Sequence, residues 1–209
     1  MNRAAWLITI LLVGAFCWIF PPFRVVPLKQ ARQHHQQGQF DAQSFATQFW
    51  ESQLLPAAAK ALQATQLLAA LTKEPDTARR QLGRSPGLSS TVYFFVQGTG
   101  QITTIQRDRV RIYLPGSSPP AEVELFTGFL FGNCVRDATG QLDASDFPNS
   151  QHFNSLSTEL NRVVESTVIP SLRQGAALGR SVRFVGCAEL QSGPPPKHLT
   201  IVPVKIEWL

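Results

Sequence analysis

Residues 149–172 read NSQHFNSLSTELNRVVESTVIPSL and predict one long amphipathic helix. Asn149 or Ser150 is typical of a helix N-cap, because a short polar side chain can accept a hydrogen bond from a free backbone N–H group of the first turn. Its apolar residues follow the i, i+3, i+4, i+7 spacing of one helix face: Phe153, Leu156, Leu160, Val163, Val164, Val168 and Leu172. Pro170 is expected to limit or kink this helix near its end.

Strand-like segments, rich in β-branched and aromatic residues, flank the predicted helix on both sides. Three precede it and two follow it: 91–105, 107–116 and 121–136, then 181–190 and 198–209. Five strands with one helix between the third and the fourth is the order of an OB-type barrel. One intervening helix is too few for the crossovers of a parallel sheet. The sequence therefore predicts an α+β protein with a five-stranded antiparallel OB-like β-barrel over residues 90–209.

A helical subdomain is predicted ahead of the barrel, over residues 41–84. Asp41 or Ser44 can cap its first helix. Pro56 is expected to kink that helix or to begin a second one, and alanine-rich sequence of high helix propensity follows. A third, short helix is predicted over residues 74–82.

Residues 4–20, AAWLITILLVGAFCWIF, carry no charge and are expected to enter a membrane. We predict a signal anchor or transmembrane segment over 1–23, followed by a linker over 24–40. Two alternatives remain, namely lipoprotein processing at Cys17 and ordinary signal cleavage. The body is expected in the periplasm, held at the bacterial inner membrane by this single N-terminal anchor. The basic residues within 24–32 count against export by the positive-inside rule.

The composition is that of a globular protein without an enzymatic signature. Apolar residues make up 44% of the 209 residues and charged residues 16%, which argues against disorder. The net charge is +5, but no lysine–arginine run exceeds two residues, which does not favour nucleic acid. G-x-S-x-G and C-x-x-C motifs are missing, and the acidic stretch 137–146 has its glycine at the wrong position for an EF-hand. We expect no enzymatic activity, cofactor, metal site or nucleic-acid partner.

Two cysteines, Cys134 and Cys187, fall within predicted strands. In an oxidising periplasm they could form a disulfide, which would close a long loop and stabilise the fold by about 2–4 kcal/mol. The alternative is a pair of buried free thiols that pack as small apolar side chains.

Polar side chains are concentrated between the third predicted strand and the long helix. Six of them are candidate binding residues: Asn133, Arg136, Asp137, Asp146, Asn149 and Asn154. Arginine, aspartate and asparagine together are common where hydroxyl groups or a polar partner surface are recognised. The alternative is structural, because the same side chains can fix a long loop by hydrogen bonds to the backbone.

Several motifs together resemble one bacterial family of unknown function, whose members are described as predicted periplasmic lipoproteins and are often encoded beside sugar ABC transport systems. The motifs are VVPL at 25–28, FDAQSFATQFWESQLLPA at 40–57, YFFVQGTGQI at 93–102, FGNCVRDATGQLDASDFPNSQHFNSLSTELN at 131–161, VGCAEL at 185–190 and VPVKIE at 202–207. The resemblance covers nearly the whole chain after the apolar segment. It implies a periplasmic compartment and a transport context, without a mechanism.

We therefore expect a membrane-anchored, non-enzymatic periplasmic protein that assists a carbohydrate uptake system. Its expected partner is a sugar-binding protein or the permease of an ABC transporter. The alternative is a protein that binds a small ligand, either a sugar or a divalent ion, through the 133–154 loop.

Overall fold

A computed structural model of the chain describes residues 40–87, 90–117, 120–194 and 197–209. The chain divides into two units, Met1–Phe40 and Asp41–Leu209, and the fold below is that of the second unit. The predicted anchor, and all of the predicted linker except Phe40, lie outside the described residues. Within the described ranges, every helix is too short or too polar to cross a membrane.

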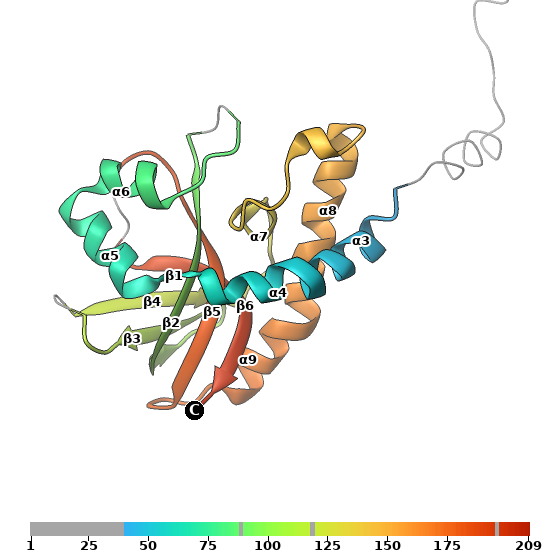
Figure 1. The fold of residues 1–209 in the computed structure, drawn as a ribbon. Coiled ribbons are helices and arrows are strands. Elements are labelled where there is room, and N and C mark those ends of the chain that lie inside the picture. Colours follow the sequence, from blue (N-terminus) through green and yellow to red (C-terminus); the bar gives the residue numbers. More distant parts are fainter. Residues whose placement is uncertain (1–39, 88–89, 118–119, 195–196) are drawn as a thin grey trace, which may run out of the picture. The chain divides into compact units, whose positions relative to one another are not determined.

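Six strands in the described part of the chain form one mixed sheet (Figure 1). They are β1 (Leu62–Gln63), β2 (Val92–Ile105), β3 (Arg109–Leu114), β4 (Ala121–Phe126), β5 (Ser181–Leu190) and β6 (Leu199–Trp208). The pairings run in the order β2–β3–β4–β6–β5 and return from β5 to β2, so these five strands close into a ring. β1 is added outside the ring as a parallel neighbour of β2.

The sheet differs from the predicted one in two respects. β4 and β6 pair in parallel, with Val123 opposite Leu199, so the prediction of a purely antiparallel sheet is wrong. The reason is geometric: a closed ring with an odd number of strands cannot alternate direction throughout, so one neighbouring pair must be parallel. The sixth strand, β1, lies in the region predicted to be helical, and its two residues are too few to leave a strand pattern.

Helices precede the ring and connect β4 to β5. They are α3 (Ala42–Phe49), α4 (Leu55–Ala57), α5 (Ala64–Lys73), α6 (Pro75–Leu82), α7 (Cys134–Asp137), α8 (Ser150–Val163) and α9 (Ile169–Gly175), with the π-helical turns η1 (Trp50–Leu54) and η4 (Val164–Val168) and the 3-10 turns η2 (Ala58–Lys60) and η3 (Ala144–Asp146). We call the continuous segment α8–η4–α9 the rod. The rod confirms the predicted long helix, and Asn149 is its N-cap, because its Oδ1 accepts the His152 N–H at 2.9 Å.

Two prolines of the described residues interrupt continuous helical segments, and each of these two follows a π-helical turn. Pro56 follows η1 and Pro170 follows η4. A proline cannot donate a hydrogen bond to the carbonyl four residues earlier, and its ring clashes with that carbonyl. In η1, Leu55 N–H instead bonds to the Trp50 carbonyl, five residues back, and η4 shows the same pattern. The wider turn lets each helix continue past its proline.

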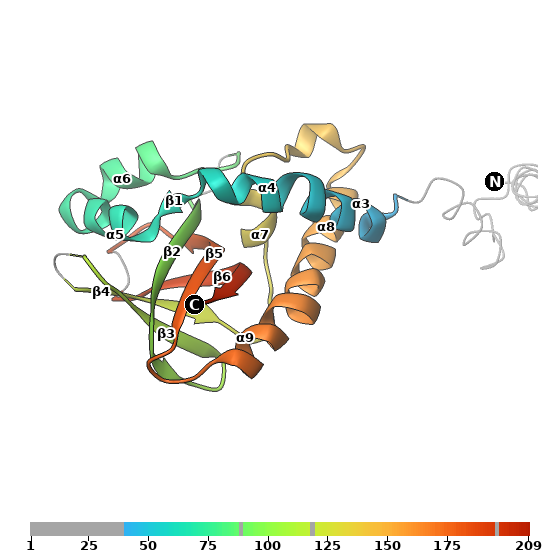
Figure 2. The same ribbon diagram turned by 60° about the horizontal axis from the view of Figure 1, so that its bottom comes forward.

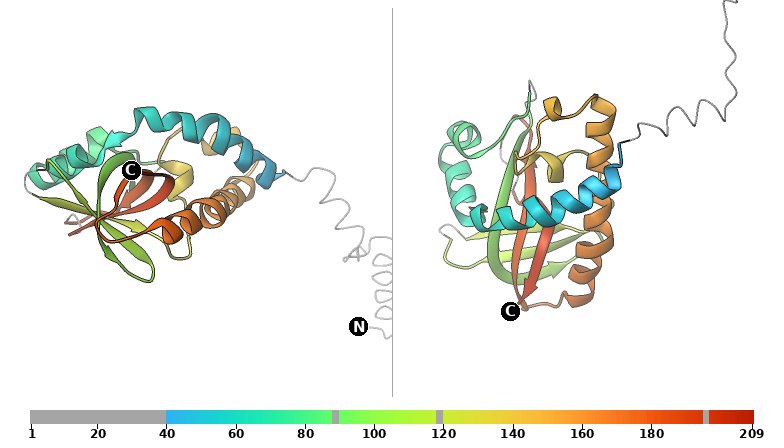
Figure 3. Two further views of the ribbon diagram at one scale, coloured as in Figure 1. Left: turned by 90° about the horizontal axis from the view of Figure 1, so that it is seen from below. Right: turned by 45° about the vertical axis from the view of Figure 1, so that its right-hand side comes forward.

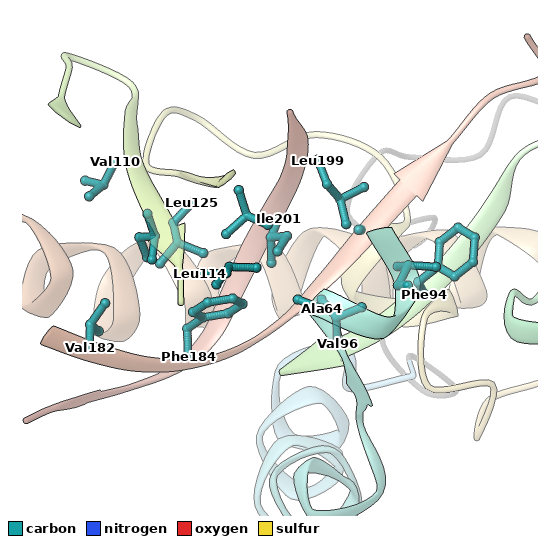
Figure 4. Packing of buried hydrophobic residues seen from close by; sticks show 14 of the residues in the cluster. Ala64, Phe94, Val96, Val110, Leu114, Leu125, Val182, Phe184, Leu199 and Ile201 are labelled. Carbon is teal, nitrogen blue, oxygen red and sulfur yellow. The ribbon is translucent and has the colours of Figure 1, made fainter. Parts of the chain in front are cut away.

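Two hydrophobic clusters share the strands. The first receives side chains from all five ring strands and includes Phe94, Leu125, Phe184 and Ile201 (Figure 4). The second joins β5 and β6 to the helices and includes Phe49, Leu54, Leu156, Leu160, Val185, Cys187 and Val204. Because neighbouring β5 residues point to opposite faces, Phe184 enters the first cluster and Val185 the second. The rod therefore packs along one side of the strands, and α3 packs on α8 (Figures 2 and 3).

Candidate functional site

Arg136 and Asp137, in α7, form a buried ion pair. Their side chains are 5% and 3% exposed. Arg136 Nε donates to Asp137 Oδ1 at 2.6 Å, and Nη2 donates to Oδ2 at 3.0 Å. Nη1 donates to the Phe153 carbonyl at 3.2 Å and to Asn154 Oδ1 at 3.3 Å. The guanidinium carbon also lies over the Phe153 ring, 3.6 Å from its centroid. All three guanidinium nitrogens therefore have acceptors, and the pair joins α7 to α8.

The other candidate residues also make internal hydrogen bonds. Asn133 Oδ1 accepts the Ser157 hydroxyl at 3.0 Å, which links the start of α7 to α8. Asp146 accepts the backbone N–H of Asp143 at 3.3 Å in a capping box at η3, and Asn149 caps α8. The structure thus brings Asn133, Arg136, Asp137 and Asn154 together at the α7–α8 contact, whereas Asp146 is the last residue of η3 and Asn149 caps α8. These contacts fit the structural alternative, and a binding role for the six residues remains a prediction.

Cys134, in α7, and Cys187, in β5, are buried free thiols. Burial raises the pKa of both, and the proximity of Cys187 adds to the rise in the pKa of Cys134. Both side chains belong to the second hydrophobic cluster. These features fit the alternative of two buried free thiols, and a disulfide between Cys134 and Cys187 remains a prediction.

The third predicted strand ends at Phe126, not at Arg136. Residues 127–133 form a loop, which we call the phenylalanine loop, and α7 follows it. Gly132 has a φ of 81°, in the left-handed region that favours glycine. A Cβ atom on Gly128 would lie 2.6 Å from the Phe126 ring. The backbone therefore leaves the sheet where the apolar sequence alone predicted a continuous strand.

The phenylalanine loop presents two aromatic side chains to solvent. Phe129 is 81% exposed and Phe131 is 88% exposed, while Leu130 between them is 8% exposed. Among the described residues these two are the most exposed large apolar side chains. Adjacent exposed apolar groups mark interaction sites on soluble proteins. The loop is therefore the candidate functional site.

Side chains of the rod hold this loop in place. Four of them hydrogen bond to it: Ser157 to Asn133 Oδ1 at 3.0 Å, Asn161 Nδ2 to the Gly132 carbonyl at 3.1 Å, Glu165 Oε1 to the Leu130 N–H at 2.7 Å, and Arg173 Nη2 to the Thr127 carbonyl at 2.6 Å. The spacing of four or eight residues between them corresponds to one face of a helix. With Leu130 buried as well, the loop is fixed to the rod while Phe129 and Phe131 remain exposed.

An open cavity of about 800 Å³ lies beside the phenylalanine loop. Its walls combine apolar and charged side chains: Phe126, Phe129, Ile169, Arg107, Asp108, Glu165 and Arg173. Asp108 pairs with Arg109 at 3.1 Å, and hydrogen bonding to that guanidinium lowers the pKa of Asp108. Glu165 already accepts the Leu130 N–H. The cavity therefore offers an apolar wall beside a rim that carries both signs of charge.

Sequence reasoning missed Phe129 and Phe131, because alternation of the GFLFG type is also typical of a strand edge. Two signals could have found the loop. The first is the pair of glycines that bracket the aromatic residues. The second is the polar series Ser157, Asn161 and Glu165, which repeats every four residues along an otherwise amphipathic helix.

Comparisons with known proteins agree with this architecture. A family model described as predicted periplasmic lipoprotein (DUF2291) matches residues 8–207. No curated protein matches the chain. The chain is similar to the crystal structure of an OB-fold protein from Thermotoga maritima, with a TM-score of 0.73 and 24% identity over 82% of this chain and 100% of that one. That likeness concerns the fold alone, and it agrees with the OB-like order of elements expected from the sequence.

Proposed function

The chain belongs to this family of predicted periplasmic lipoproteins, and we propose that it is a membrane-anchored, non-enzymatic binding module that captures a partner protein on the phenylalanine loop. The observation that carries the proposal is the exposure of Phe129 and Phe131, 81% and 88%, on a loop that the rod holds by four hydrogen bonds.

The phenylalanine loop can supply much of the binding energy. Fully burying one large apolar side chain is worth about 1.5–3 kcal/mol, so Phe129 and Phe131 together offer about 3–6 kcal/mol. Interfaces concentrate their energy in a few such aromatic residues. Because the loop backbone is already fixed, little conformational entropy is lost when a partner binds.

A protein partner fits this surface better than a lipid surface does. Anionic membranes attract clusters of lysine and arginine. Here Arg107 and Arg173 share the cavity rim with Asp108 and Glu165, so the charges are mixed. A protein can place a side chain in the cavity and match both signs of charge around it.

For the partner we propose a sugar-binding protein or the permease of an ABC transporter, in line with the transport context of the family resemblance. The body then lies in the periplasm, held at the inner membrane by a single N-terminal anchor. The alternative, a sugar or divalent ion bound by the 133–154 loop, has less support. Arg136 and Asp137 direct their polar atoms into the protein, where other groups already satisfy them.

Site-specific photocrosslinking in intact cells tests the proposal. A photoreactive amino acid replaces Phe131 in the full chain, and the same group replaces Leu178 as a control. Leu178 is also exposed, at 70%, but lies outside the phenylalanine loop. We expect one transporter component to be crosslinked from position 131 and not from position 178. Crosslinking from position 131 to lipid alone would contradict a protein partner.

A double substitution completes this test. Phe129→Ser with Phe131→Ser is expected to abolish co-purification of the partner and to leave the melting temperature nearly unchanged, because both side chains are exposed. Leu178→Ser serves as the matched control and should retain the partner. Equal recovery of the partner with the double variant and the control would exclude the loop as the binding surface.

A further inference from the structure

A second cavity lies at the end of β4 opposite to the phenylalanine loop. It has a volume of about 540 Å³ and is lined by residues of α5, of the start of β4 and of the segment before β6. Leu68, Leu71 and Leu199 give it apolar surface, and Glu122 and His198 line it with polar atoms. This size and this mixture of groups are typical of sites for small molecules.

Glu122 and His198 face each other in this cavity without completing a hydrogen bond. His198 Nδ1 lies 3.9 Å from Glu122 Oε2, beyond hydrogen-bonding distance. Among the described residues, the buried Nδ1 atom has no hydrogen-bond partner. The nearest other cation, Arg111, lies 4.0 Å from Oε2 and donates instead to Glu124 at 2.9 Å. Glu122 Oε1 accepts the Thr103 hydroxyl at 3.1 Å, so Oε2 is the carboxylate oxygen left to bind a ligand beside the unpartnered His198 Nδ1.

A hydroxyl group matches this pair of atoms. It can donate to the carboxylate oxygen of Glu122 and accept from an N–H at His198 Nδ1 at the same time. Lys197 also lines the cavity, so its formal charge offsets that of Glu122. A cavity without net charge favours an uncharged ligand over an ion. The leucine side chains then suit an apolar face of the same molecule.

We propose that this cavity binds a small uncharged molecule with hydroxyl groups on one side and an apolar face on the other, held by Glu122 and His198. A cyclic sugar has this chemistry, and so does a cyclic polyol. The site shares no residue with the phenylalanine loop, so binding of the small molecule and capture of a partner protein can be tested separately.

Ligand titrations of the full chain in detergent test the chemical class. The uncharged probes are glucose, ribose and 1,2-cyclohexanediol; glycerol lacks the apolar ring face, and gluconate and glucosamine carry a charge. By saturation-transfer NMR and calorimetry we expect at least one uncharged ring compound to bind at millimolar concentration. Glycerol and the charged compounds should bind at least about tenfold more weakly. Binding of none of the uncharged ring compounds, or tighter binding of a charged one, would overturn the proposal.

Substitutions test the two residues. Glu122→Gln replaces a charged acceptor by a weaker, neutral one, and His198→Leu removes the imidazole N–H. Each is expected to weaken binding by about tenfold or more. Glu207→Gln makes the same change of charge at an exposed ion pair with Lys205 and should not alter affinity. Melting temperatures check that each variant folds. Unchanged affinity in both cavity variants would exclude these residues as the site.

The unmodified protein provides a readout that needs no substitution. Long-range ¹H–¹⁵N spectra resolve the imidazole nitrogens, and ligand addition is expected to shift the resonance of His198 Nδ1. His152, in α8 outside this cavity, is the internal reference and should not move. A ligand that binds without shifting the His198 resonance would place its site elsewhere and overturn the proposal.

Discussion

Arg136 has the hydrogen-bonding capacity that recognition of a polar ligand requires, yet groups of the protein itself occupy that capacity. Its guanidinium is bidentate to Asp137, bonds to the Phe153 carbonyl and Asn154, and stacks on the Phe153 ring. Charged side chains are rarely buried unless they are paired. The sequence identifies Arg136 as unusual, but only the packing of α7 on α8 shows which groups satisfy it.

The first prediction concerns removal of this guanidinium. Arg136→Ala leaves the Asp137 carboxylate buried without its partner, which costs about 3–5 kcal/mol of unfolding free energy. Arg162→Ala is the control, since Arg162 is 64% exposed and pairs with Glu159 at 3.5 Å; its loss should cost about 1 kcal/mol or less. Urea unfolding of both variants measures the difference. A similarly small loss in both would show that the Arg136–Asp137 pair does not support the fold.

Elements with regular patterns could be predicted from the sequence, and elements held by distant residues could not. The rod and β5 were found because apolar periodicity runs through them to their ends. The third strand was extended too far because the stretch from Phe126 to Leu130, rich in phenylalanine, looks locally like a strand. Glu165 and Arg173 lie far along the chain and fix this stretch as a loop by hydrogen bonds to the backbone of Leu130 and Thr127. Local propensity cannot report such contacts.

The second prediction tests the attachment of the phenylalanine loop to the rod. Glu165→Ala removes the acceptor of the Leu130 N–H, so we expect faster hydrogen exchange at Leu130 and weaker capture of the partner, although both phenylalanines remain. The lost bond to a charged acceptor is worth about 1.5–3 kcal/mol locally. Glu165→Gln keeps an oxygen acceptor at the same position, so its exchange rate at Leu130 should lie closer to that of the natural protein. Equal exchange rates at Leu130 in all three proteins would show that this bond does not order the loop.

In the unit as a whole, closure of the ring depends on contacts between segments that are far apart in sequence. β2 pairs with β5 over most of its length and with β3 beyond Gln101. A Cβ atom on Gly100 would lie 2.2 Å from the Tyr113 carbonyl, so glycine permits the close approach where β2 changes partners. The strand order was predictable from the number of strands and the place of the helix. Closure of five strands also requires one parallel pair, but neither the β4 nor the β6 sequence shows that these two strands form it.

The ring strands and α7 also contain three buried acidic groups whose pKa values are raised, namely the Tyr93 hydroxyl and the Cys134 and Cys187 thiols. Burial, with smaller contributions from Asp137 and Glu189, raises the pKa of Tyr93 from 10.0 to about 12, and burial also raises the pKa values of Cys134 and Cys187. Above the unfolded-state pKa values, the folded chain holds protons that the unfolded chain has lost. Stability is therefore expected to fall with rising pH, by about 1.4 kcal/mol per pH unit for each such group.

Urea unfolding across the alkaline range measures this loss and assigns it. The two thiols should contribute to the loss of stability above pH 9.0, which is their usual pKa. Tyr93 should contribute between pH 10.0 and about 12. Tyr93→Phe removes the titrating hydroxyl, so its stability should fall less steeply over that upper range, whereas Tyr113→Phe removes the same atom outside this buried group and serves as the control. Equal slopes in the two variants would mean that alkaline unfolding begins elsewhere. Tyr93 lies on β2, Cys187 on β5 and Cys134 on α7. A shallower slope for Tyr93→Phe alone would therefore show that protonation where these three elements meet supports the whole fold.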